Sequence, residues 1–187
     1  MTDQQKNLAN GLPQTFRFIT DHNSDGKAIF SDRIPEGQPW VPVDGQANFA
    51  LNYTTSQYPV SFKDNKDLAQ YEGNLTAKPG LVVPGGSVLR VVDLMPGGVS
   101  AMHRTVSLDY GVVLEGEIYL ELDSGEKRLM RRGDISIQRG TNHAWRNNSD
   151  KQWARMMYVL LEAEPMQVGD KFLGEDLGEM KNVRSSG

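Results

Sequence analysis

Two histidines and one aspartate are the residues whose types could support chemistry. His103 comes shortly before Asp109, and His143 lies further along in a stretch containing Gly140 and Asn142. Imidazole nitrogens and a carboxylate oxygen are suitable ligands for Zn²⁺, Fe²⁺, Mn²⁺ or Ni²⁺, and such a set leaves coordination positions open for a substrate. The same groups can transfer protons without a metal. We therefore take His103, Asp109 and His143 as candidate catalytic residues and as candidate metal ligands.

Composition excludes several other kinds of chemistry. The chain contains no cysteine, which excludes thiolate catalysis, disulfides and sulfur-ligated metals. The formal net charge of −4 lacks the surplus of Lys and Arg on which nucleic-acid binding depends. No apolar run has the length of a membrane-spanning helix, and the polar start lacks a signal-peptide pattern. We expect a cytoplasmic protein that binds a small-molecule substrate, with no nucleic-acid or membrane partner.

Short β-strands are the elements that must position these residues. In the stretch EIYLEL, the apolar Ile118, Leu120 and Leu122 alternate with polar or amphipathic residues, as in a strand with one buried face. Turn residues separate further stretches rich in Val, Ile and aromatic residues. The pattern predicts a short helix over 64–72 and strands over 16–20, 49–54, 87–94, 111–114, 117–122, 134–138 and 153–161. Antiparallel strands closed by such turns are typical of an all-β barrel or sandwich.

Two stretches resemble the conserved motifs of the cupin superfamily. The first runs from Pro96 to Gly116, where His103 takes the place of the first motif histidine and Asp109 that of the glutamate. Thr105 stands where the second histidine is usual. The phrasing HRTVSLDYGVVLEGE is similar to a fungal subgroup of small single-domain cupins found near polyketide biosynthesis pathways.

The second motif lies in the stretch RRGDISIQRGTNHAWRN, where His143 takes the place of the motif histidine. Gln138 occupies a position where proline is usual. The resemblance implies a single jelly-roll antiparallel β-barrel with an N-terminal arm and few short helices. Residues 1–86 would form the arm and leading strands, 87–165 the barrel core and 166–187 a C-terminal tail, within one structural domain. Because such an arm could exchange between subunits, we expect a homodimer.

Five residues that flank the motif histidines are candidate substrate contacts. Side chains alternate between the two faces of a strand, so the sequence does not decide which of them point into the barrel. An inward arginine could bind a carboxylate or enolate, and an inward aromatic ring could stack on a substrate ring. For the two aromatic residues, ordinary core packing is the competing interpretation. The candidates are Arg104, Thr105, Tyr110, Trp145 and Arg146.

Three functions remain open at this point. The first is a lyase or isomerase of secondary metabolism that dehydrates, decarboxylates or isomerises a polyketide-like substrate, using a divalent metal or a His–Asp acid–base pair. The second is a non-haem iron oxygenase that uses the same three residues. The third is a metal-free cupin that binds a small ligand without changing it. Because Asp is shorter than Glu, Asp109 could orient an imidazole or accept a proton instead of binding a metal.

Overall fold

The chain divides into two compact units. The computed structural model describes residues 7–186, and the division falls between Pro39 and Trp40. Residues 1–6 of the predicted arm and residue 187 of the predicted tail lie outside the described residues. The predicted barrel core began at residue 87, whereas the second unit begins with two earlier strands that pair with that core.

A β-hairpin is the regular element of the first unit. It consists of β1 (Thr20–His22) and β2 (Ala28–Phe30), which pair antiparallel. The side-chain oxygen of Asn23 accepts hydrogen bonds from the backbone N–H groups of Asp25 and Lys27, at 3.0 and 2.9 Å. An Asn side chain bonded in this way takes the place of a backbone turn contact. The sequence predicted a strand over 16–20, whereas β1 covers Thr20–His22.

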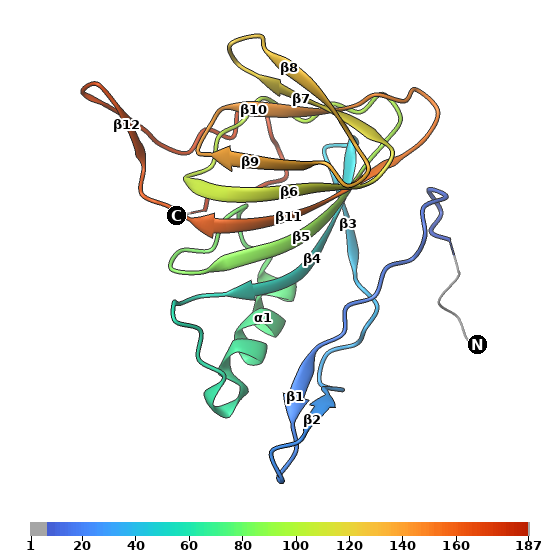
Figure 1. Cartoon of the computed structure of the whole chain (residues 1–187), viewed down its shortest axis with the longest axis vertical. Helices are drawn as coiled ribbons and strands as arrows, with labels where there is room; N and C mark the ends of the chain where they lie inside the picture. The colour runs from blue at the N-terminus through green and yellow to red at the C-terminus, as the bar shows by residue number, and fades with distance from the viewer. Residues whose placement is uncertain (1–6, 187) are drawn as a thin grey trace. The chain divides into compact units, whose positions relative to one another are not determined.

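Two antiparallel sheets form the second unit (Figure 1). The larger sheet has, in spatial order, β3 (Trp40–Val43), β4 (Ala47–Thr55), β5 (Ser87–Leu94), β11 (Ala154–Glu162), β6 (Ser107–Glu115) and β9 (Ile135–Arg139). The smaller sheet has β10 (His143–Asn147), β7 (Glu117–Leu122) and β8 (Lys127–Arg131). A separate two-stranded ribbon contains β12 (Met166–Val168) and β13 (Lys171–Leu173). The predicted all-β architecture is confirmed.

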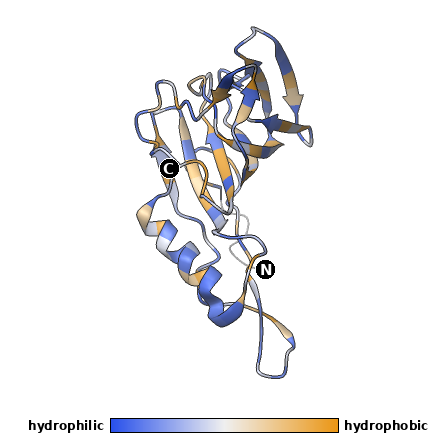
Figure 2. Ribbon diagram, turned by 90° about the vertical axis from the view of Figure 1, so that its left-hand side faces the viewer, coloured by the Kyte–Doolittle hydropathy of each residue, from blue (hydrophilic) through white to orange (hydrophobic). Residues whose placement is uncertain are grey.

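The core lies between these two sheets. Apolar and polar residues alternate along the strands, which Figure 2 shows as alternating orange and blue segments. Because successive side chains point to opposite faces, each strand contributes every second residue to the core. Val88 and Val92 of β5 and Met156 of β11 come from the large sheet, and Ile118 of β7 and Trp145 of β10 come from the small one. Closure of the two sheets over this core creates the space for a site.

The strand predictions succeed for several strands of the large sheet and for β7, and they miss others. The predicted ranges 87–94 and 117–122 coincide with β5 and β7. The strands β3, β8 and β10 were not predicted. The β10 sequence HAWRN contains no β-branched residue, so its extended conformation comes from pairing with β7 rather than from propensity.

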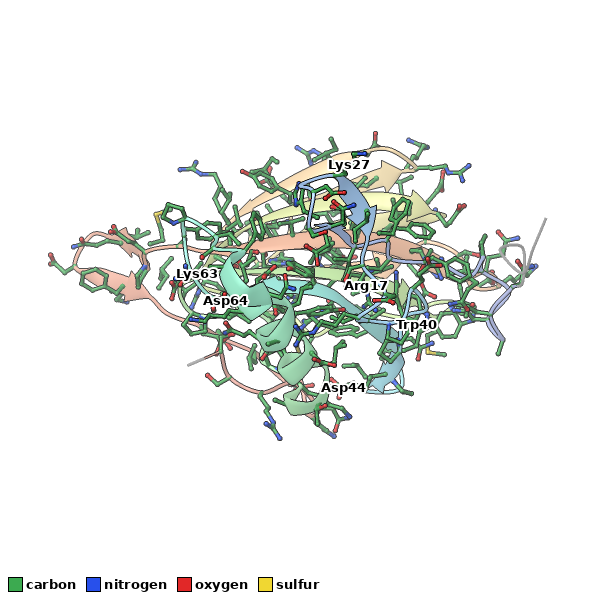
Figure 3. All side chains as sticks on the ribbon, turned by 90° about the horizontal axis from the view of Figure 1, so that it is seen from below. Arg17, Lys27, Trp40, Asp44, Lys63 and Asp64 are labelled. Carbon is green, nitrogen blue, oxygen red and sulfur yellow. The ribbon has the colours of Figure 1, made fainter. Side chains whose placement is uncertain are left out.

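The helix is longer than the sequence predicted. A short 3₁₀ segment, η1 (Lys63–Asn65), precedes α1 (Lys66–Ala77), and Figure 3 labels Lys63 and Asp64 at its start. Leu68 and Tyr71 are buried, and the Tyr71 hydroxyl donates a hydrogen bond to the Leu51 carbonyl of β4 at 2.8 Å. Beyond the predicted range, Asn74 Nδ2 donates to Thr54 Oγ1 of β4 at 2.9 Å, a contact that holds the last turn on the sheet. Among residues 7–186, no helix has both the length and the apolar character needed to span a membrane.

The C-terminal tail packs on the barrel. Leu177, Met180 and Val183 contact the core cluster. The carboxylate of Asp44, labelled in Figure 3 in the turn between β3 and β4, accepts hydrogen bonds from the backbone N–H groups of Lys181 and Asn182 at 3.2 to 3.3 Å. These contacts hold the tail so that Met180 reaches the cavity described below.

A buried ion pair crosses the large sheet from β5 to β11. Asp93 and Arg155 are 0% and 2% exposed, and they are register partners on adjacent strands. The guanidinium donates Nε to Oδ1 at 2.6 Å and Nη2 to Oδ2 at 2.8 Å, a bidentate arrangement. The Trp40 ring covers the guanidinium, with 5.1 Å from its carbon to the ring centroid. Removing either partner would leave the other charge buried.

We expect Asp93→Asn to lower the free energy of unfolding by about 3 kcal/mol or more, because Arg155 would lose its compensating charge in a buried site. The matched control is Glu117→Gln, which removes the partner of the exposed Arg131 and should cost at most about 1 kcal/mol. Urea denaturation measures both losses. Equal small losses in the two variants would contradict a stabilising role for the buried pair.

Candidate functional site

A cavity between the two sheets contains the candidate catalytic residues. It leaves about 80 Å³ for the centres of water-sized molecules, which is room for several waters. His103, Thr105, Asp109, His143 and Trp145 line it, together with mainly apolar side chains from β4, β5, β11 and the tail. The structure therefore brings the three predicted catalytic residues to one cavity, although His143 lies far from the other two in the sequence.

Backbone pairing positions the two histidines. The N–H group of each donates to the carbonyl of the other at 2.9 Å. Directly paired residues of this kind project their side chains from the same face, close to one another. The two imidazole centroids are accordingly 4.4 Å apart, and the residues are only 7% and 3% exposed. The edge of the Trp145 ring closes one side of His143, with 5.4 Å between ring centroids.

Both imidazoles contact a backbone carbonyl oxygen through the same ring nitrogen. His103 Nδ1 lies 2.8 Å from the Ala101 carbonyl oxygen, and His143 Nδ1 lies 2.9 Å from that of Thr141. A carbonyl oxygen only accepts hydrogen bonds, so each Nδ1 carries a proton and each neutral Nε2 keeps a lone pair. Burial lowers the pKa of His103. Burial, together with repulsion between the two rings when both are protonated, lowers the pKa of His143 to about 3. Both rings are neutral at pH 7.

A chain of hydroxyls leads to Asp109. Thr105, Ser107 and Asp109 are buried at alternate positions and share the inward face. Ser107 Oγ lies 2.5 Å from Asp109 Oδ1 and 2.7 Å from Thr105 Oγ1. The Ser107 hydroxyl donates to the carboxylate, and the Thr105 hydroxyl donates to Asp109 Oδ2 at 3.5 Å. Burial raises the pKa of Asp109 to about 6, against the opposing effect of these hydrogen bonds. Asp109 thus exchanges its proton near neutral pH.

The two imidazoles meet the requirements of metal ligands, but a complete set of three is not formed. Each is neutral and donates Nδ1–H to a carbonyl, as metal-ligating histidines usually do. Asp109, the predicted third ligand, is instead held by Ser107. Within residues 7–186, no group of three or more His, Cys, Asp or Glu side chains is arranged to hold a metal ion. Metal binding by His103, Asp109 and His143 together stays a prediction.

The five candidate substrate contacts separate by strand face. Thr105 and Trp145 line the cavity, whereas Arg104, Tyr110 and Arg146 do not. Tyr110 is exposed because its neighbour Asp109 faces inward. Arg146 follows the inward Trp145, and its Nε donates to Glu121 Oε1 at 2.7 Å on the outer surface. The Nε of Arg104 donates to the carbonyl of Gly174 at 2.7 Å. The structure thus places no guanidinium of these candidates at the site.

Sequence reasoning missed several polar residues of the site. Arg90 of β5 and Tyr158 of β11 line the cavity, and Ser107 bonds Asp109. One signal was available for Arg90, since it alternates with apolar residues in the strand SVLRVVDL and so shares their buried face. Tyr158 carries no comparable signal, because an aromatic residue in an apolar strand reads as ordinary core.

Comparison with known proteins supports a family assignment. A model of the cupin domain matches residues 90–160. A cupin-domain-containing oxidoreductase of Neurospora crassa is 41% identical over 170 residues, which cover 91% of this chain and 85% of that protein. The chain belongs to the cupin family. The resemblance that the two sequence motifs indicated, and the cupin fold it implied, are confirmed.

Other relatives of this cupin carry names that refer to biosynthesis clusters. Phomopsin biosynthesis cluster protein D of Diaporthe leptostromiformis is 51% identical over 158 residues, 84% of each chain. Oryzines biosynthesis cluster protein J of Aspergillus oryzae is 48% identical over 171 residues, which cover 91% of this chain and 96% of that protein. Among solved structures, the polyketide cyclase RemF from Streptomyces resistomycificus is 20% identical and covers 63% of this chain and 66% of its own, with a TM-score of 0.42.

The raised pKa of Asp109 makes the stability of this cupin depend on pH. The folded protein holds the proton more tightly than the unfolded chain, so this contribution to stability is full below the ordinary pKa of 3.8 and is lost as the pH rises through about 6. Asp109→Asn cannot ionise. We expect its unfolding free energy, relative to wild type, to increase by up to about 3 kcal/mol between about pH 4 and about pH 8.

Urea denaturation at the two pH values measures this difference. Asp123→Asn, at an exposed turn position, is the matched control for removal of one carboxylate. A difference for Asp109→Asn that is the same at both pH values, or that falls as the pH rises, would show that burial does not hold the Asp109 proton.

Proposed function

We propose that this cupin is an enzyme of small-molecule metabolism that transfers protons on a substrate bound in the barrel cavity. The observation that supports it is the placement of Asp109 and the neutral imidazoles of His103 and His143 around one buried, mainly apolar space. Acid–base catalysis uses groups that change protonation near neutral pH in a site with little water. Burial raises the pKa of Asp109 to about 6 and lowers the pKa of both imidazoles.

The roles follow from the protonation states. A free imidazole Nε2 can remove a proton from carbon next to a carbonyl group. Protonated Asp109 can donate its proton to a departing hydroxyl, which leaves as water, or to another carbon of the substrate. The first sequence is a dehydration and the second an isomerisation, and a decarboxylation needs only the protonation step. Ser107 keeps the carboxyl oriented through its hydrogen bond to Oδ1.

The names of the relatives support a place in secondary metabolism. Two of them are named for the biosynthesis clusters of phomopsin and of oryzines. These names state no substrate for either protein, and a polyketide-like substrate remains the proposal drawn from the sequence resemblance. The cytoplasmic location and the homodimer are likewise proposals for this chain.

A second candidate function is oxidoreduction. Relatives in Neurospora crassa and Hypocrea virens are named cupin-domain-containing oxidoreductases, and they are 41% and 42% identical to this chain. The carbonyl-bound Nδ1 atoms of His103 and His143 also leave both Nε2 atoms available to a metal. A metal held there would supply Lewis-acid or redox chemistry.

Solvent-exchange measurements test the proton-transfer function. The protein is incubated without oxygen in deuterated water with a panel of hydroxyketones and β-keto acids. We expect it to act on at least one of these compounds, which would then take up deuterium, lose water or lose carbon dioxide. Mass spectrometry follows each product. Asp109→Asn and His143→Gln should slow the reaction by about 100-fold or more, because each removes a proton-transfer group. Tyr110→Phe, on the outer face of the same strand, is the matched control and should keep the rate.

The outcomes separate the alternatives. A wild-type rate in Asp109→Asn would remove that residue from the mechanism. Product formation only with oxygen present would favour the oxidoreductase. A ligand that binds but stays unchanged in every condition would favour a binding protein without catalysis.

Elemental analysis tests the second candidate. For an oxidoreductase with a histidine-bound metal, protein purified without added metal or chelator should contain about one metal ion per chain, and both His103→Gln and His143→Gln should lose it. The same low metal content in all three proteins would contradict this function.

A further inference from the structure

Arg90 is a buried cation in a mainly apolar cavity. It is 7% exposed and lies on β5 between the inward-facing Val88 and Val92. It lines the same cavity as His103 and Asp109. An isolated charge is costly in a low-dielectric interior, so buried arginines are normally paired with carboxylates. The environment of Arg90 therefore requires an explanation.

In the part of the chain that the structure describes, the contacts of Arg90 are with neutral groups. Its Nη2 donates to the Gly80 carbonyl oxygen at 3.1 Å, and its guanidinium carbon lies 5.3 Å from the Phe49 ring centroid. Within residues 7–186, the structure records no ion pair for it. Asp93, the other charged residue of β5, faces the opposite side of the sheet and binds Arg155. Burial lowers the pKa of Arg90 to about 10, so the guanidinium stays charged at neutral pH.

Strand register sets the distance between Arg90 and the proton-transfer groups. Arg90 pairs with Tyr158 on β11, and Tyr158 pairs with Gly111 on β6, two residues after Asp109. Adjacent strands are about 4.8 Å apart, so the backbones at Arg90 and Gly111 are separated by roughly 10 Å. Tyr158 lies between them on the inner face of the sheet.

We propose that Arg90 binds an anionic group of the substrate, and that this group is a carboxylate whose apolar body extends past Phe49 and Tyr158 towards Asp109. This assignment rests on the proposed function and specifies its substrate class as an organic acid with an apolar body. Planar guanidinium and carboxylate groups join through two parallel hydrogen bonds. Arg104 and Arg146 face away from the cavity, which leaves Arg90 as the arginine that lines it within residues 7–186.

Ligand-observed NMR with simple probes tests this assignment. The probes are benzoate, its neutral analogue benzamide, and inorganic phosphate. We expect the wild type to bind benzoate. Arg90→Gln should bind it at least roughly tenfold more weakly, because a charge-assisted hydrogen bond is lost. Arg90→Lys should fall between them, and benzamide should bind wild type and Arg90→Gln alike. The matched control Arg104→Gln should bind benzoate as the wild type does.

Comparison of the two anions identifies the group that Arg90 receives. Tighter binding of phosphate than of benzoate, with the same dependence on Arg90, would assign a phosphate instead of a carboxylate and overturn that part of the proposal. Equal benzoate binding by wild type and Arg90→Gln, or no binding of either anion to the wild type, would overturn it entirely.

Two further measurements keep the result independent of folding and of the proposed catalysis. In protein labelled with ¹⁵N-arginine, the Nε–H resonance of Arg90 is the one that is missing in Arg90→Lys. Benzoate should shift this resonance in the wild type. The absence of a shift would overturn the assignment even if Arg90→Gln does not fold. Asp109→Asn should still bind benzoate. If Asp109→Asn binds benzoate and the proton-transfer assay fails, Arg90 remains the anion site and only the proposed proton transfer is contradicted.

Discussion

Two backbone hydrogen bonds between His103 and His143 are the interaction on which the site depends. Each residue donates to the other at 2.9 Å, and the same pairing continues to Val99 and Arg146. The loop before β6 is thereby joined to β10, a strand of the opposite sheet. Because the backbone sets the direction of both imidazoles, they stay close together and buried without a direct bond between their rings. The site is consequently a product of barrel closure.

Burial then sets the chemistry of the groups that closure brings together. The same low-dielectric surroundings lower the pKa of the two imidazoles and raise that of Asp109, since each shift favours the neutral form. A base and a protonatable acid therefore coexist near neutral pH. Carbonyls of Ala101 and Thr141 and the hydroxyl of Ser107 offset part of the cost of burying these polar groups.

The departures of this chain from the cupin motif are connected in space. Thr105 stands at the position of the second motif histidine and Asp109 at that of the glutamate, and Ser107 joins the two through hydrogen bonds. Residues at the places of two motif ligands thus form a chain of hydroxyls and a carboxyl, while the two remaining histidines keep free Nε2 atoms. The proposed proton transfer is based on this arrangement, whereas relatives with up to 42% identity are named oxidoreductases.

The sequence by itself determined the all-β class and the bounds of β5 and β7, because these depend on alternation along the chain, and the resemblance to the cupin motifs gave the motif positions of His103, Asp109 and His143. Only the tertiary structure decided which face of each strand is buried. Tyr110 and Arg146 face outward because their neighbours Asp109 and Trp145 face the cavity. Pairing with β7 made β10 a strand, and packing on β4 lengthened α1. Alternation along β5 indicates the buried face of Arg90, but its place in the cavity follows from the pairing of β5 with β4 and β11.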